Sequence, residues 1–316
     1  MRYRFLISVS LFFVLLSGVH YLIMNQLRST DFGQYGKLNL IFEKKGSFDV
    51  VYFGSSRTAF HFDPRIIDSI ANVNSCNMGI TATNDVVSLA AIKTYLSNCE
   101  IKPKVIVVNF DFFLWDNQNI DDVNSSIPRF LPYIYNPILY NSLASLDPSY
   151  AKLKYANFFS FTYLTDYFYY ELYRGLVNHE IARDKEFKCR GFQSVPYQQK
   201  IENFQTSRNN EIICVSERQI NATKQIFTLL KNDNIKLIPV VTPIFKSYSF
   251  TNSDNELFER LKEICYEFEL NCFNYSNKKY CQEKNNFFDE IHLNNEGLEK
   301  FNIDFANDLV QILSQK

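Results

Sequence analysis

Short apolar runs separated by helix-like stretches recur along most of the chain. Residues 48–53 read Phe-Asp-Val-Val-Tyr-Phe, and Gly54 ends this run. A short, nearly continuous apolar run closed by a turn residue is typical of a strand buried on both faces of a parallel sheet. Similar runs lie at 73–77, 104–110, 236–241 and 271–275. The sequence therefore predicts five buried strands.

Helical spacing fills the intervals between these runs. Asp63-Pro64 precedes Ile66, Ile67 and Ile70, which predicts a helix with proline at its first position. Further helices are predicted at 85–96, 217–231, 255–268 and 295–313. Alternation of this kind favours a parallel sheet with right-handed crossovers. The predicted fold class is α/β, a three-layer α/β/α sandwich with a parallel, flavodoxin-like sheet.

The alternation stops between about residues 111 and 212. Within this region, residues 150–173 are crowded with aromatic side chains. We interpret it as a helical insertion in one enlarged domain that spans 47–316. The aromatic side chains could stack on sugar rings, but the buried face of a helix explains them better.

The N-terminus begins with an apolar segment long enough to cross a bilayer. Residues 5–24 contain no Asp, Glu, Lys or Arg, and as a helix they would extend about 30 Å. Arg2 and Arg4 precede them, which favours a cytoplasmic N-terminus and an extracytoplasmic domain. A cleaved signal peptide is the alternative, although no A-x-A-like cleavage site is found. We predict an uncleaved transmembrane helix at 1–25 and a juxtamembrane linker at 26–46, with room for one short helix in the linker.

Composition and charge exclude some classes of function. The net charge is −1 and the pI is near 6.4, so the chain lacks the basic character of nucleic-acid-binding proteins. Seven cysteines are scattered without a C-x-x-C pair, a pattern that indicates neither a zinc knuckle nor a thioredoxin-like site. We expect no metal and no cofactor. Outside the cytoplasm some cysteines could pair, or all could be small buried hydrophobes.

Two loops that follow predicted strands carry candidate catalytic residues. Open α/β sheets bind ligands at the carboxyl ends of their strands. Residues 54–57 read Gly-Ser-Ser-Arg, and 289–292 read Asp-Glu-Ile-His. A serine hydroxyl becomes a nucleophile when an imidazole accepts its proton and a carboxylate orients that imidazole. We predict Ser56, His292 and Asp289 for these roles, although each motif alone is also common as a turn and helix cap.

The order and spacing of these motifs resemble those of the SGNH (GDSL-like) hydrolase superfamily. Its nucleophilic serine follows the first strand, and its Asp-x-x-His pair precedes the last helix. Here His292 is followed by Leu293-Asn294-x-x-Gly297, the usual continuation. The resemblance covers roughly residues 48–110 and 215–316. It implies that the backbone N–H groups of Ser56 and Gly79 serve the oxyanion hole.

The chain departs from the superfamily pattern at two positions. Ser55 replaces the aspartate of Gly-Asp-Ser, and the third-block Gly-x-Asn-Asp is absent. Asn109 or Asp111 can take the place of the missing asparagine, and Asn109 is the better donor to an oxyanion. Arg57 and Asp111 are candidates for binding substrate, although Arg57 can instead pair with an acid. Structural roles for Asn109 and Asp111 are equally open.

The Gly-Ser-Ser-Arg start, the anchor and His61-x-Asp63-Pro64 together resemble bacterial cell-envelope proteins related to D-alanine transfer proteins and polysaccharide O-acetyltransferases. The resemblance implies an esterase or O-acyltransferase in the bacterial inner membrane, with its catalytic domain in the periplasm. The expected partners are an acylated glycan or other acyl ester, the lipid bilayer and a membrane acyltransferase. A catalytically inactive scaffold that binds the glycan or the acyltransferase is the alternative.

Overall fold

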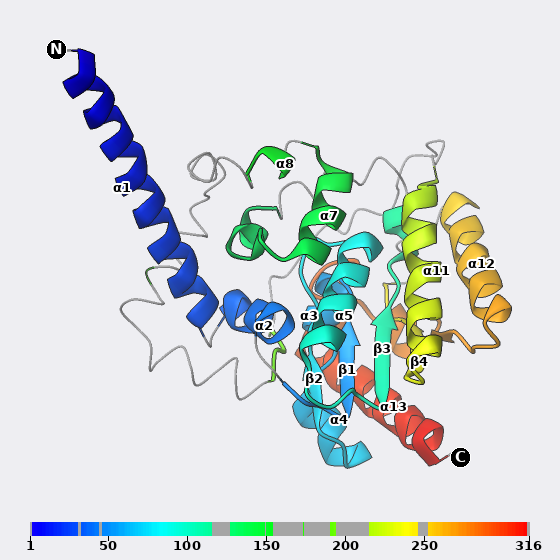
Figure 1. Ribbon diagram of the computed structural model, residues 1–316. Helices are drawn as coiled ribbons and strands as arrows, with labels where there is room; N and C mark the ends of the chain where they lie inside the picture. Colours follow the sequence, from blue (N-terminus) through cyan, green and yellow to red (C-terminus); the bar gives the residue numbers. More distant parts are fainter. Residues whose placement is uncertain are drawn as a thin grey trace.

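A five-stranded parallel sheet forms the centre of the fold (Figure 1). The computed structural model describes residues 2–30, 33–43, 46–115, 127–148, 150–153, 173, 190–193, 215–245 and 252–314. The strand order is β2-β1-β3-β4-β5, the flavodoxin-like order, and every neighbouring pair is parallel. The strands are β1 (Val50–Phe53), β2 (Ser75–Asn77), β3 (Val105–Asn109), β4 (Lys236–Val241) and β5 (Phe273–Asn274). The predicted fold class is confirmed.

Helices cover both faces of this sheet. Successive side chains of a strand point to opposite faces, so Val51 and Ile106 enter one core cluster while Val50 and Val105 enter the other. The first cluster is covered by α2 (Gly33–Phe42), α5 (Asp85–Asn98), α11 (Glu217–Asn232) and α12 (Asn252–Glu267). The second is covered by α4 (Pro64–Ala71) and α13 (Asn295–Ser314). Burial on both faces explains why the strands read as continuous apolar runs.

Most of the described part of the predicted insertion is helical, although residues 190–193 are not. Its elements are η1 (Phe112–Trp115), η3 (Ile127–Tyr133), α7 (Pro137–Leu146) and α8 (Tyr150–Leu153). Leu139 and Leu143 of α7 are buried in the same cluster as α5. Nearly all of the aromatic segment 150–173 lies outside the described residues, so its role stays a prediction.

The N-terminal helix α1 (Arg2–Ser29) projects away from the body of the molecule (Figure 1). Within Tyr3–Ser29, a window of 18 residues has a mean hydropathy of 2.2, and the helix is long and apolar enough to cross a membrane. Its first turns expose large side chains, among them Phe5 and Leu11. The side chains of its last turns, including Met24 and Leu27, are instead buried against the body.

The segment predicted as a juxtamembrane linker is packed into the fold. It contains α2, in which Tyr35, Leu38 and Ile41 are buried at helical spacing. Asn39 of the same helix donates hydrogen bonds to the carbonyl oxygens of Leu27 (2.8 Å) and Thr30 (2.7 Å) at the end of α1. Helix α1 is therefore joined to the core by a short, hydrogen-bonded corner instead of an extended tether.

Replacing Asn39 should loosen this corner. In Asn39→Ala the carbonyls of Leu27 and Thr30 lose a buried donor, and the hydroxyl of Tyr133, 2.5 Å from Asn39 Oδ1, loses its acceptor. A buried polar group left unpaired costs about 1–3 kcal/mol. Thermal unfolding of the full chain in detergent should show a lower midpoint for Asn39→Ala. Ser145→Ala, at an exposed site, is the control, and equal midpoints for the two variants would contradict the assignment.

Candidate active site

Ser56 begins a short helix directly after β1. Gly54 has φ of +145°, and a Cβ there would lie 2.9 Å from the carbonyl oxygen of Asn109 and closer still to Thr58 Oγ1. Only glycine fits such a turn. Ser55 then caps α3 (Ser56–His61), because its hydroxyl accepts a hydrogen bond from the N–H of Arg57 (3.3 Å). The sequence Gly-Ser-Ser-Arg thus places Ser56 on the first turn of α3, at the carboxyl end of β1.

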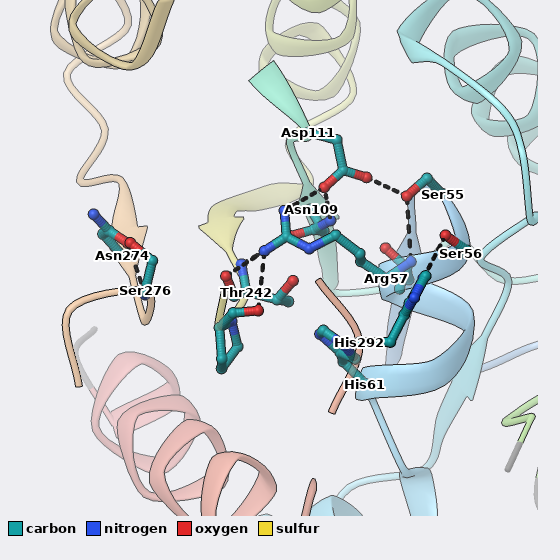
Figure 2. Close-up of polar contacts among 12 residues, drawn as sticks. Ser55, Ser56, Arg57, His61, Asn109, Asp111, Thr242, Asn274, Ser276 and His292 are labelled. Atoms are coloured by element: carbon teal, nitrogen blue, oxygen red, sulfur yellow. Dashed lines mark hydrogen bonds and ion pairs between the residues drawn. The ribbon is translucent and has the colours of Figure 1, made fainter. Parts of the chain in front are cut away.

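Ser56, His292 and Asp289 form one hydrogen-bonded chain. Ser56 Oγ lies 2.9 Å from His292 Nε2, as Figure 2 shows. On the other side of the ring, His292 Nδ1 lies 2.7 Å from Asp289 Oδ2 and 3.0 Å from Oδ1. The side chains of His292 and Asp289 are 16% and 26% exposed, so solvent reaches both. The structure thus brings together the three residues predicted as catalytic.

The loop that carries His292 is held by two independent contacts. Asp289 Oδ1 accepts the N–H groups of Ile291 (2.9 Å) and His292 (2.7 Å), which closes a tight turn. The fully buried His61 accepts the N–H of Leu293 at Nε2 (3.1 Å). Burial lowers the pKa of His61 well below its usual value, and the nearby charges of Arg57 and His292 lower it further. The neutral imidazole is the form in which Nε2 accepts this hydrogen bond.

Asp289 is held in its ionised form. Burial by itself would raise the pKa of its carboxyl group. The hydrogen bond and charge of His292 and the two backbone N–H groups of the turn all lower this pKa, and together they outweigh the effect of burial. The net result is a pKa below the usual aspartate value. An ionised Asp289 accepts a hydrogen bond from the N–H at Nδ1 of His292. With its proton on Nδ1, the imidazole can accept the Ser56 hydroxyl proton at Nε2.

A buried ion pair lies beneath α3. Arg57 Nη1 is 2.6 Å from Asp111 Oδ1, and the two side chains are 1% and 3% exposed. Asp111 also accepts hydrogen bonds from the hydroxyl of Ser55 and from Asn109 Nδ2 (3.0 Å). Arg57 Nη2 donates to the carbonyl oxygens of Thr242 and Pro243, the latter at 3.3 Å. Figure 2 shows how this network joins the ends of β1, β3 and β4.

The same network changes the picture for two predicted substrate-binding residues. Arg57 and Asp111 are buried and bound to each other, so the structure places neither on the accessible side of the site. This arrangement corresponds to the alternative in which Arg57 pairs with an acid. Burial lowers the pKa of Arg57, and the charge of Asp111 opposes that shift. The ion pair therefore positions the loops of the site.

Two predicted oxyanion donors are already engaged within the protein. Asn109 Nδ2 donates to Asp111, and Asn109 Oδ1 accepts the N–H of Thr242 (2.9 Å). The N–H of Gly79 donates to Asn77 Oδ1 at 3.0 Å. Gly79 is instead required by close packing, because a Cβ there would lie 2.5 Å from the backbone nitrogen of Ala59. The N–H of Ser56 differs, since the first residue of a helix has no acceptor within that helix.

Sequence reasoning missed two asparagines that support the site. Asn77 Nδ2 donates to the carbonyl oxygens of Thr58 and Phe62, both at 2.7 Å, across α3. Asn302 of α13 donates to the carbonyl oxygen of His61 (2.8 Å) and accepts the N–H of Asp63 (2.9 Å). A polar residue on the otherwise apolar buried face of the last helix was the available signal for Asn302.

The described residues offer no evident metal site. Among them, no group of three or more His, Cys, Asp or Glu side chains is placed to hold a metal ion.

Comparisons with known proteins add little to this picture. No family model matches the chain, and no curated protein matches it. Eight chains of solved structures match. One of these is described as "The structure of a putative platelet activating factor from Streptococcus pneumonia"; it is 9% identical, the match covers 96% of this chain and 99% of that one, and the TM-score is 0.46. A likeness this low carries no inference about fold or chemistry.

Replacing one partner of the buried ion pair should destabilise the fold more than replacing both partners. Asp111→Leu leaves the Arg57 guanidinium buried without a counter-charge, which costs about 3–5 kcal/mol. The double variant Arg57→Met/Asp111→Leu removes both charges and should recover much of that loss. Denaturant unfolding of the full chain in detergent measures both. A double variant that is less stable than Asp111→Leu would contradict the ion-pair account.

The low pKa of Asp289 predicts a pH-dependent contribution to stability. An unfolded aspartate titrates near pH 3.9 and the folded one below that value, so the contribution is complete above about pH 5. It is lost as the pH falls through the folded pKa. The gap in unfolding midpoint between the native chain and Asp289→Asn should therefore be larger at pH 7 than at pH 3. A gap independent of pH would contradict the assignment.

Proposed function

We propose that the chain is a membrane-anchored, extracytoplasmic serine esterase or O-acyltransferase of the SGNH type. Its substrates are acyl esters, acetyl esters first among them, on cell-envelope glycans. The observation that carries the proposal is the hydrogen-bonded chain of Asp289, His292 and Ser56 at the carboxyl edge of a parallel sheet. Each heavy-atom distance in that chain lies within the range expected for a nucleophile, its base and the orienting acid.

The proposed reaction proceeds through an acyl-enzyme. Ser56 Oγ attacks the acyl carbonyl carbon while His292 Nε2 takes the hydroxyl proton. Asp289 holds Nδ1–H and stabilises the imidazolium that forms. When the tetrahedral intermediate collapses, the bond between the acyl carbon and the sugar oxygen breaks, and His292 returns the proton to that oxygen. Water as the second acceptor makes the chain an esterase, and a sugar hydroxyl makes it an acyltransferase.

Most of the predicted donors to the oxyanion are engaged within the protein. The N–H of Ser56 is the donor that the arrangement leaves free of an acceptor in its own helix. The N–H of Gly79 and the amide of Asn109 are bonded elsewhere. This observation favours the second candidate, an inactive scaffold of the same fold that binds glycan or a membrane acyltransferase.

The attachment of α1 supports action at a membrane surface. Asn39 fixes the end of α1 to the core, so little freedom separates the anchor from the site-bearing domain. In Figure 1, α1 leaves the body toward the side to which the strand arrows point, which is the side of the candidate site. This arrangement suits a substrate or an acyl donor presented at the bilayer.

Covalent labelling tests the proposal directly. The full chain in detergent is treated with a fluorophosphonate probe and assayed for acetate released from an acetylated ester. We expect labelling at Ser56, and a loss of turnover of about 10⁴-fold or more in Ser56→Ala and His292→Ala. Adding an oligosaccharide acceptor distinguishes transfer, seen as an acetylated product, from hydrolysis.

Ser69→Ala is the matched control for this experiment. Ser69 is exposed on α4, where its hydroxyl donates to the carbonyl oxygen of Ile66 (2.7 Å). The Ser69→Ala variant should react with the fluorophosphonate probe and release acetate as the native chain does. A native chain that is folded yet neither labels nor releases acetate favours the scaffold. Labelling that persists in Ser56→Ala would show that the probe reacts with a residue other than Ser56.

A further inference from the structure

The turn between α12 and β5 folds the chain back on itself through a defined helix end. The N–H of Leu270 donates to the carbonyl oxygen of Cys265 (2.9 Å), and the N–H of Glu269 donates to that of Tyr266 (3.0 Å). Glu269 has φ of +59°. These two hydrogen bonds and the left-handed residue define a Schellman motif. The chain beyond it returns along the end of α12 before β5 begins.

This reversal brings two thiols together. Cys265 lies in the last turns of α12 and Cys272 directly precedes β5, and the side chain of each is the largest influence on the pKa of the other. Both pack against the same core cluster, Cys265 within it and Cys272 at its edge. The hydrogen bond from Cys272 lowers the pKa of Cys265, whereas the same contact and burial raise that of Cys272. Cys265 is therefore the better nucleophile of the two.

Three other described cysteines are in different surroundings. The thiols of Cys76, Cys99 and Cys281 each donate to a backbone carbonyl oxygen instead of another sulfur. Burial raises the pKa of Cys76 to about 12 and that of Cys281 to about 11, which suppresses their thiolate forms. Among the described cysteines, only Cys265 and Cys272 combine contact between sulfurs with an activated thiol.

We propose that Cys265 and Cys272 form a disulfide that closes the turn between α12 and β5 when the chain meets a disulfide-bearing oxidant. Cys272, the more exposed of the two, attacks one sulfur of the oxidant as its thiolate, which gives a mixed disulfide and releases one thiol. The Cys265 thiolate then attacks the Cys272 sulfur and releases the second thiol. Two electrons and two protons pass to the oxidant, and one S–S bond forms in the chain.

The bond would reinforce a weak edge of the sheet. β5 contributes only the pairs Val240–Phe273 and Val241–Asn274 to the ladder with β4. A covalent link from the residue before β5 to α12 restricts the unfolded chain at this edge. We expect oxidation to raise the thermal midpoint by about 5 °C. The proposal is independent of Ser56 chemistry, because neither sulfur belongs to the candidate active site.

Peptide mapping tests the pairing on the full chain in detergent. The chain is incubated with oxidised glutathione, quenched with acid, alkylated under denaturing conditions, digested and analysed by mass spectrometry. We expect the peptides of Cys265 and Cys272 to be joined and lighter by two hydrogen atoms, with Cys76, Cys99 and Cys281 alkylated. Alkylation of both Cys265 and Cys272, or their linkage to other cysteines, would overturn the proposal.

Thermal unfolding with and without reductant provides the second readout. The oxidised native chain and Cys99→Ser, the matched control, should both lose about 5 °C when reduced. Cys265→Ser and Cys272→Ser should show no such shift, because neither can form the bond. A reductant-dependent shift that survives in both variants assigns the effect to other cysteines. Mapping of the native chain decides the question even if a variant fails to fold.

Discussion

The buried pair of Arg57 and Asp111 lies where three strands end, and the position of Ser56 depends on it. Two charges removed from water are costly unless hydrogen bonds satisfy their remaining groups. Here Asp111 also accepts hydrogen bonds from Ser55 and Asn109. Arg57 donates to the carbonyl oxygens of the residues that follow β4. The N-cap of α3 is thereby fixed to β3 and β4. Ser56 is the next residue, so its direction toward His292 follows from the same network.

This arrangement commits polar groups at the strand ends to structure. Asn109 donates one amide hydrogen to Asp111 and accepts the N–H of Thr242, so both ends of its side-chain amide are fixed within this network. Gly79 likewise gives its N–H to Asn77, which in turn holds the carbonyl groups of α3. The loops that would supply a conventional oxyanion hole instead stabilise the helix that carries the candidate nucleophile. Rigid placement of Ser56 and a complete oxyanion hole thus compete for the same groups.

Local pattern was sufficient to predict the strands and the main helices, whereas the proximity of Ser56 to His292 was predicted from the joint order of the motifs and their resemblance to the SGNH superfamily. Those features depend on short apolar runs, on caps such as Asp63-Pro64 and on the convergence of loops at one sheet edge. The pairing of Arg57 with Asp111 depends on contacts between residues far apart in the chain, and sequence left it as one of two alternatives. The burial of α2 was missed because glycine, lysine and asparagine separate its apolar positions. Only the packed structure shows that Asn39 faces the end of α1.

Two positions at which the chain departs from the SGNH pattern that it resembles meet in one contact. Ser55 stands where the superfamily has an aspartate, Asp111 lies near the position of the missing third block, and the Ser55 hydroxyl donates to the Asp111 carboxylate. A carboxylate thus remains beside α3, supplied by the loop after β3 instead of the loop after β1. The absent third block is therefore a weak reason to favour an inactive scaffold, since its place is occupied by the buried, hydrogen-bonded network of Arg57, Asp111 and Asn109. The stronger reason is the N–H of Gly79, because its bond to Asn77 must break before it can serve an oxyanion.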